Sequence, residues 1–196
     1  MKNMIGWCRR KFASFTRDRS GNVLLELGFA TSILATMTMG GVEVGRYVLM
    51  HQKLERVVSS VGDLVSQSED LTPTHVTNLF DAAQHVIQPF ELADNGVVIV
   101  SSILGVEGSP PQISWQMSGG GTLIAASELG LACNDATLPE GFTLVPGDTA
   151  IIAEVFFEYT PWMFEGIAEP GQQYHRALFR PRFGTLSVLE GEPPCP

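Results

Sequence analysis

The residues of this chain that could do chemistry are its histidines, its cysteines and a surplus of carboxylates. His75 and His85 are too far apart in sequence to stack as i, i+4 metal ligands. His51 falls in an expected polar helix, and His175 stands alone in an expected loop. No HExxH, GxSxG, Walker A or CxxC motif occurs. Cys133 and a distant histidine could in principle form a nucleophile–base pair, but most chains contain residues that could be paired in this way. We therefore predict no catalytic residue, no cofactor and no metal, and we do not expect an enzyme.

Glu26 is the most informative carboxylate, because it lies inside a long apolar run. From Asn22 to Val44 the only charged residues are Glu26 and Glu43, and the run approaches the ~20 residues that a helix needs to cross a bilayer. A carboxylate at mid-bilayer costs about 2.5–3.5 kcal/mol on insertion scales, so it usually has a partner. Otherwise Glu26 lies near the interface and reaches the lipid headgroups.

Charge is distributed very unevenly around this run. Six of the twelve Lys and Arg residues precede it, whereas fifteen Asp and Glu residues and no cation lie in the stretch 57–175. By the positive-inside rule, residues 1–21 are cytoplasmic and the chain after the span is periplasmic. A nucleic-acid surface needs clustered cations, so we exclude nucleic acid as a partner. The basic residues of the leader are Lys2, Arg9, Arg10, Lys11, Arg17 and Arg19.

Two other interpretations of the apolar run are weaker. A secretory signal peptide has an apolar core of about 7–15 residues that ends in a small-residue cleavage site, and this run is longer and lacks that site. A buried core helix would leave the charge asymmetry unexplained. The sequence therefore favours a transmembrane helix over residues 22–45, followed by a helical continuation over residues 46–70.

The start of the run resembles the class III signal that prepilin peptidases recognise in type IV pilins. A basic leader ends at Gly21, Asn22 follows, and Glu26 is the fifth residue counted from Asn22. The resemblance implies cleavage between Gly21 and Asn22 on the cytoplasmic side, with the helix left attached. Cleavage would expose an α-amino group that is cationic near neutral pH. In assembled pilins the corresponding carboxylate neutralises the amine of a neighbouring subunit, so Glu26 would set subunit register.

Three later segments resemble the TadE-like family of the tight-adherence (Tad/Flp) pilus systems. The first is Gly41-Val42-Glu43-Val44-Gly45-Arg46, which closes the span. The second is the stretch 153–161, which ends in Tyr-x-Pro, and the third is the aromatic-Arg-Pro-Arg segment within 177–184. The motif residues of the first segment are Gly41, Glu43, Gly45 and Arg46.

This resemblance implies a minor pilin or pseudopilin in the bacterial inner membrane, which enters an extracellular pilus or stays in the membrane. Its partners would be a prepilin peptidase, other pilins and the pilus assembly platform. Major Flp pilins are much shorter and carry Glu-Tyr where this chain has Glu26-Leu27, so a bulk filament subunit is disfavoured. Some related proteins keep their leader, which leaves open an unprocessed, membrane-anchored binding or adhesion module. A membrane-anchored periplasmic enzyme is the least favoured alternative.

Cys133 and Cys195 lie in the acidic part of the chain, without metal-ligand spacing around them. If this part is exported to an oxidising compartment, we expect them to form a disulfide. Closing a loop of roughly 60 residues would contribute about 4 kcal/mol through loop entropy. The alternative is that both are buried or reactive thiols.

The rest of the pattern predicts an α+β fold. We expect the first helix to continue to about Ser68, with an apolar stripe that the protein's own domain covers. The stripe consists of Leu54, Val57, Val61 and Leu64, with Val58 and Val65 beside them. Thr72-Pro73 predicts the start of a second helix that stops near Pro89. Strands are expected over 97–104, 112–118, 150–159 and 177–189. Residues 71–196 would then form a periplasmic, pilin-like domain with an antiparallel sheet against the helices.

Overall fold

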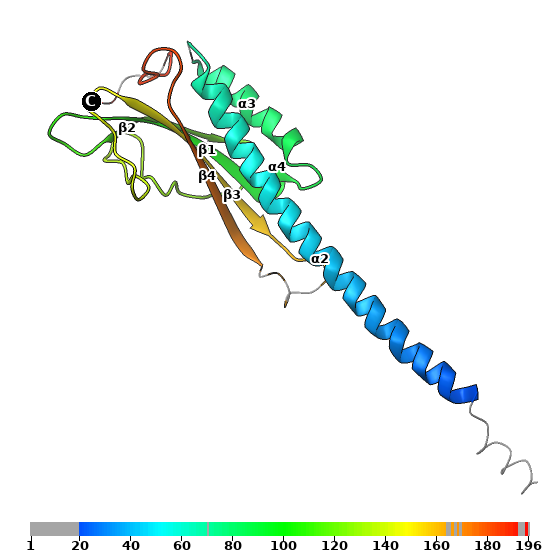
Figure 1. The fold of residues 1–196 in the computed structure, drawn as a ribbon. Coiled ribbons are helices and arrows are strands. Elements are labelled where there is room, and N and C mark those ends of the chain that lie inside the picture. The colour runs from blue at the N-terminus through cyan, green and yellow to red at the C-terminus, as the bar shows by residue number, and fades with distance from the viewer. Residues whose placement is uncertain are drawn as a thin grey trace, which may run out of the picture.

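The computed structural model describes residues 20–69, 71–163, 166, 168, 170–191 and 195. The predicted leader up to residue 19 therefore lies outside the described residues. The first element is α2, Ser20–Ser66, a single helix of 47 residues (Figure 1). At 1.5 Å per residue it is about 70 Å long. The prediction of one continuous helix through the apolar run and beyond is confirmed, with its end two residues earlier than expected.

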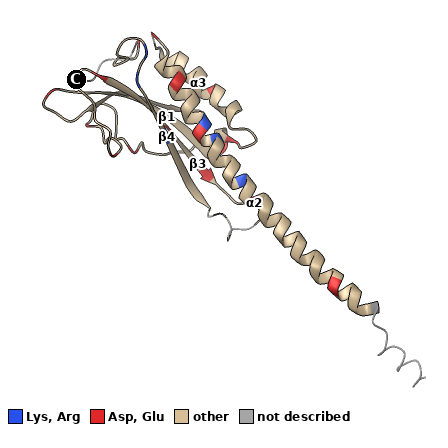
Figure 2. Cartoon of the chain, in the orientation of Figure 1, with Lys and Arg blue, Asp and Glu red and all other residues tan. Residues whose placement is uncertain are grey.

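The first half of α2, residues 20–42, projects away from the rest of the protein (Figure 1). Glu26 is its only charged residue, and Figure 2 accordingly shows this half with a single acidic position. Within the described residues, α2 is the one helix long and apolar enough to cross a membrane, and its most apolar stretch is uncovered by the chain. The exposed large side chains are Val23, Leu24, Leu25, Leu27, Phe29, Ile33, Leu34, Met37, Met39 and Val42.

The second half of α2 packs against the sheet through one apolar stripe. Its buried members are Met50, Leu54, Val57, Val58, Val61 and Val65. The prediction that the domain covers this stripe is confirmed, but Leu64 was wrongly included, since it is 47% exposed. Val58 and Val65, which were predicted beside the stripe, are fully buried. Val65 follows Leu54 by eleven residues, just over three helical turns, so it lies on the same face of α2.

The sheet has four antiparallel strands in the order β2-β1-β3-β4. They are β1 (Gly96–Leu104), β2 (Gln112–Gly119), β3 (Thr149–Tyr159) and β4 (Gly171–Phe179). The α+β class and the antiparallel sheet are confirmed, and the first three strands lie where the sequence predicts them.

Both faces of the central strands are covered, which explains why β1 and β3 are almost continuously apolar. Val98, Val100, Ala153 and Val155 face α2 and α3 in the main core. The alternate residues of the same strands lie under the long connection between β2 and β3, in two smaller clusters. Figure 1 shows the helices on one side of the sheet and this connection on the other.

Two shorter helices, α3 and α4, add residues to the main core on the same side of the sheet as α2. In α3, Pro73–Val86, Thr72 is the N-cap, its hydroxyl accepts a hydrogen bond from the His75 N–H at 3.2 Å, and Pro73 is the first helical residue. The predicted start is therefore confirmed. After Pro89, the one-turn helix α4 (Leu92–Asn95) leads directly into β1.

The predicted strand over 177–189 is wrong for most of its length. β4 begins earlier, at Gly171, and ends at Phe179, just before Arg180-Pro181. Proline has no N–H for the strand ladder, so it ends strands. Beyond it the Arg182 N–H donates to the Ser66 carbonyl at 2.8 Å, which ties the segment to the end of α2. The first part of β4 escaped prediction because Gln172, Gln173 and Arg176 give an edge strand no apolar alternation.

Candidate functional site

Glu43 is buried where the projecting half of α2 meets the domain, with 1% of its surface exposed. Its Oε1 accepts from the Tyr159 hydroxyl at 2.8 Å and from the Trp162 N–H at 3.1 Å. Its Oε2 lies 3.0 Å from the Met163 N–H, which donates to it, and 3.2 Å from the Trp162 nitrogen. A buried carboxylate is costly unless hydrogen bonds compensate it, and these three donors do so.

Local sequence explains how the donors reach Glu43. Glu43 precedes Met50 by seven residues, so it extends the buried stripe of α2 by two turns. β3 ends at Tyr159, and Pro161 follows, after which the backbone turns its N–H groups toward the helix. Burial and the Glu43 carboxylate raise the pKa of the Tyr159 hydroxyl, so it stays a donor. The structure thus joins the Gly-x-Glu block to the Tyr-x-Pro segment, which are far apart in sequence.

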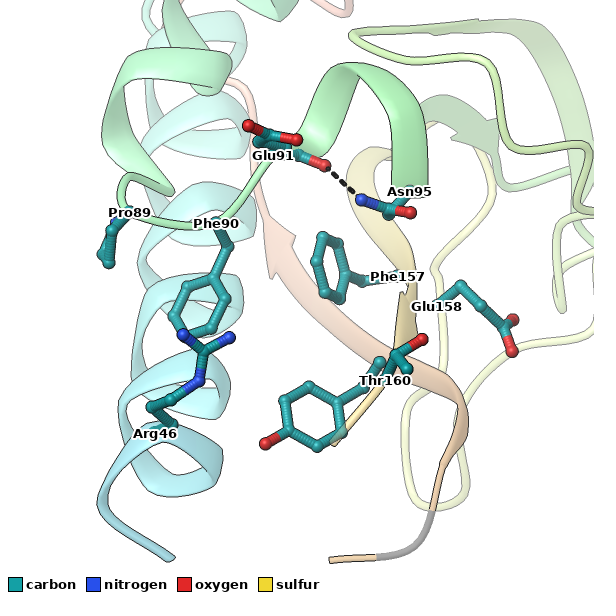
Figure 3. A pocket seen from close by; sticks show the side chains of 9 residues that line it. Arg46, Pro89, Phe90, Glu91, Asn95, Phe157, Glu158 and Thr160 are labelled. Atoms are coloured by element: carbon teal, nitrogen blue, oxygen red, sulfur yellow. Dashed lines mark hydrogen bonds between the residues drawn. The ribbon is translucent and has the colours of Figure 1, made fainter. Parts of the chain in front are cut away.

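Arg46 lies one turn beyond Glu43 and lines a pocket of about 210 Å³ (Figure 3). Its guanidinium carbon is 5.5 Å from the centre of the Phe90 ring and 5.6 Å from that of Trp162. These distances are those of cation–π contacts. Arg46 Nε is buried without a hydrogen-bond partner among the described residues. The other pocket residues are Pro89, Glu91, Asn95, Phe157, Glu158, Tyr159 and Thr160.

A histidine pair follows on the same side of α2. His51 Nδ1 and His175 Nε2 are 2.8 Å apart, and Tyr47 packs edge-on against His51. His175 therefore lies in β4 opposite α2, and the expectation that it stands alone in a loop is wrong. Burial lowers the pKa of both imidazoles, and their mutual repulsion lowers that of His175 further, while Glu55 raises it. One neutral ring donates and the other accepts.

The predicted cleavage and register residues lie apart from this junction. Gly21, Asn22 and Glu26 are exposed on the projecting half of α2. Glu26 precedes Glu43 by seventeen residues, which places it about 26 Å away along the helix axis. Of the family-motif residues, Glu43 and Arg46 enter the junction, whereas Gly41 and Gly45 are exposed and have open space around them.

The expected disulfide is present in the structure. Cys133 and Cys195 are bonded, with their Cα atoms 5.2 Å apart. Cys133 lies in the connection between β2 and β3, and its N–H donates to the Ile113 carbonyl at 2.8 Å. The bond therefore ties the last described residue of the chain to the edge of the sheet at β2.

A second buried carboxylate, Glu154, was missed by sequence reasoning. It is fully buried in β3 and accepts hydrogen bonds from the Ser127 hydroxyl, the Glu128 N–H at 3.1 Å and the Tyr174 hydroxyl at 2.9 Å. Burial and the Glu154 charge raise the pKa of Tyr174. The sequence did contain a signal for this site, because Glu154 is the one acid within the apolar stretch 150–157. These contacts hold the β2–β3 connection against the sheet.

The described residues contain no group of three or more His, Cys, Asp and Glu side chains placed to hold a metal ion. Comparisons with protein-family models, with curated proteins and with solved structures give no significant match. The geometry of the junction and of the projecting helix therefore carries the functional argument.

Proposed function

We propose that this protein is a minor pilin or pseudopilin that acts in the assembly of a Tad/Flp-type pilus. Its leader, residues 1–21, would lie in the cytoplasm and its α+β domain in the periplasm. The first half of α2 would cross the inner membrane and could later pack among other pilin helices. The partners would be a prepilin peptidase, other pilins and the assembly platform.

One observation carries this proposal: α2 is a single helix whose first half is apolar and uncovered, and whose second half packs against the antiparallel sheet of the domain. Residues 20–42 match the length that crosses a bilayer core of ~30 Å. The cations of the leader, together with the lack of Lys and Arg over residues 57–175, support this orientation. A helix shared between membrane and domain suits a subunit that moves from lipid into a filament.

The two acids of α2 support different parts of the proposal. Glu26 is exposed on the uncovered half and pairs with no other residue that the structure describes, which leaves it available to another molecule. We assign it to the α-amino group of a neighbouring subunit, created by cleavage after Gly21. Glu43 accepts its hydrogen bonds from within the chain and connects α2 to the end of β3. A force on the membrane helix would therefore be transmitted to the domain.

The N-terminus of the protein in native membranes tests this proposal. Mass spectrometry with and without the host's prepilin peptidase should find a chain that starts at Asn22 only when the peptidase is present. In parallel, Glu26→Ala should abolish recovery of the protein in sheared pili, whereas Glu69→Ala, at an exposed position far along the chain, should not.

Finding Met1 intact in both strains would contradict cleavage after Gly21. The result would favour the alternative function, an unprocessed, membrane-anchored binding or adhesion module. Normal incorporation of Glu26→Ala into pili would remove the role of Glu26 as a register residue. A correctly cleaved protein that remains in the membrane under all conditions would instead indicate an assembly component outside the filament.

A further inference from the structure

We propose that the turn after β3, formed by Trp162 and Met163, inserts into the headgroup region of the bilayer that α2 crosses. The partner of this turn is therefore a lipid surface, and the domain rests on the membrane in a fixed orientation. Figure 1 shows that β3 ends and β4 begins at the end of the domain from which the first half of α2 projects. The inference rests on the membrane span of the proposed function and does not depend on pilus assembly.

The domain leaves the side chains of Trp162 and Met163 uncovered. Their exposed fractions are 65% and 43%, whereas Phe157 and Tyr159, just before them in β3, are buried. Indole combines a broad apolar ring with one N–H donor, and tryptophan is enriched where proteins meet the membrane–water interface. The turn therefore has the chemistry of an interfacial anchor.

Hydrogen bonds to Glu43 fix the depth of the turn. The N–H groups of Trp162 and Met163 donate to the Glu43 carboxylate at 3.1 and 3.0 Å. Glu43 directly follows residues 20–42, which match the thickness of the hydrocarbon core, and helical side chains tilt toward the N-terminus of their helix. The backbone of the turn is therefore held at the boundary between the hydrocarbon core and the headgroups.

The surface of α2 at the same level favours lipid as the partner. Val42 and Val44, on either side of Glu43, are 46% and 49% exposed, and Val48 is 48% exposed one turn further on. Apolar side chains are thus exposed on the helix as well as on the domain at this height. A bilayer is a partner that covers both at once.

The contact between Arg46 and Trp162 suits the headgroup region. The Arg46 guanidinium carbon is 5.6 Å from the centre of the Trp162 ring, a cation–π distance that restricts the orientation of the indole. Arg46 lies three residues beyond Glu43, about 4.5 Å along the helix axis. An arginine charge is costly in hydrocarbon and is tolerated among headgroups, so the ring it contacts belongs at that level.

Quenching of tryptophan fluorescence by brominated lipids tests the inference in the full chain. The chain is reconstituted in vesicles of phosphatidylcholine brominated either near the headgroup or near the end of the acyl chains. Trp7→Phe removes the tryptophan of the leader and leaves Trp115 and Trp162. Bromines near the headgroup should quench more of the emission than bromines near the chain ends, and Trp162→Phe should abolish this quenching.

The second remaining tryptophan, Trp115, should contribute little to the quenching. It is 4% exposed and pairs with Ser102 in β1, whereas Gly96, at the start of β1, pairs with Phe157 close to the turn. These two positions of β1 are about 20 Å apart. Trp115 is therefore remote from the proposed membrane surface.

A matched control moves the exposed tryptophan to the other end of the domain. In the Trp162→Phe background, Phe183→Trp places an indole at an apolar position that is 55% exposed. The preceding residue, Arg182, donates to the Ser66 carbonyl, and Ser66 lies about 35 Å beyond Glu43 along α2. This tryptophan should be quenched by aqueous iodide and by neither brominated lipid.

A tryptophan in the first half of α2 separates failure of the docking from failure of the span. Leu34→Trp in the Trp162→Phe background reports on the span, at a position that is 63% exposed. Lipid quenching at position 34 but not at position 162 would overturn the docking and leave the proposed function standing. Absence of lipid quenching at both positions would overturn the span and the docking together.

Two further results are decisive. Shielding of Trp162 from both iodide and brominated lipid would overturn the docking in favour of a protein that covers the turn. Lipid quenching of Trp162 in a chain that never joins pili would support the docking and contradict the proposed function alone.

Discussion

The two halves of α2 form one continuous helix, yet they carry their apolar side chains in different ways. Residues 20–42 are apolar all around and exposed, whereas the second half is apolar along one stripe that the sheet covers. A helix that is apolar all around needs lipid or other helices around it, and one with a stripe needs a folded partner. The difference locates the boundary between the two environments near Glu43.

The two acids of the helix show the same contrast. Glu43 has three donors within the chain, whereas Glu26 lies on the uncovered half. An acid satisfied internally stabilises the fold, and an acid in an apolar surface without such partners points to another molecule. The predictions below test this separation, from the largest expected effect to the smallest.

Removing the disulfide should affect only the domain. A Cys133→Ser, Cys195→Ser variant should lose about 4 kcal/mol of unfolding free energy, because a long loop in the unfolded chain is no longer closed. Denaturant unfolding of the full chain in detergent, followed by tryptophan fluorescence, measures this loss. The amount of protein recovered from the membrane fraction should not change. A variant that no longer enters membranes would show that the projecting half of α2 depends on the folded domain.

A matched pair of leucines compares the halves directly. Leu54→Ala should cost about 3 kcal/mol of domain stability, because this side chain is fully buried and its removal leaves a cavity. Leu34→Ala, at a position that is 63% exposed, should leave domain unfolding in the same detergent unchanged. Equal losses at both positions would mean that the projecting half also packs against the domain.

Replacing Glu43 should weaken the joint between the halves. Glu43→Ala leaves the Tyr159 hydroxyl and two backbone N–H groups without their acceptor, and we expect a loss of about 2–3 kcal/mol. Hydrogen exchange at residues 159–163 should rise as well. Glu26→Ala is the control and should change neither quantity.

The histidine pair should make domain stability depend on pH. The pKa of His51 and of His175 is lowered in the folded chain. Near and below pH 6.5, the ordinary pKa of histidine, the unfolded chain therefore binds more protons than the folded chain. Stability is therefore fully present above that pH and declines as the pH falls from there toward the folded pKa values. Unfolding curves between pH 7.5 and 5 measure the decline, and His51→Gln should make it shallower.

The smallest effect is expected for the ion pair that ends the packed half. Arg182 and Asp63 are 2.8 Å apart, but 59% and 38% of their side chains are exposed. Arg182→Ala should change the unfolding free energy by less than about 1 kcal/mol, since solvent screens exposed pairs. A loss comparable to that of Leu54→Ala would show that the segment after β4 stabilises α2 more than its contacts indicate.

Local patterns explain what the sequence could predict. The Thr72-Pro73 cap, the stripe of α2 and the apolar strands β1 and β3 each carry a periodic or positional signal within a short window. The partners of Glu43, His51 and Glu154 lie in distant segments, and no local pattern determines which segments the sheet brings together. The prediction missed the polar start of β4 for a related reason: an edge strand needs little apolar surface, so its sequence carries little strand signal.

Spin-label accessibility in lipid vesicles tests most directly whether the halves of α2 occupy different environments. Labels are attached to Leu34→Cys and to Leu64→Cys, which is 47% exposed in the second half of α2, each in a Cys8→Ser background. We predict that the label at position 34 is accessible to oxygen and shielded from a water-soluble nickel chelate, with the reverse at position 64. Equal nickel accessibility at both positions would contradict the membrane span and, with it, the account of the protein as an anchored subunit.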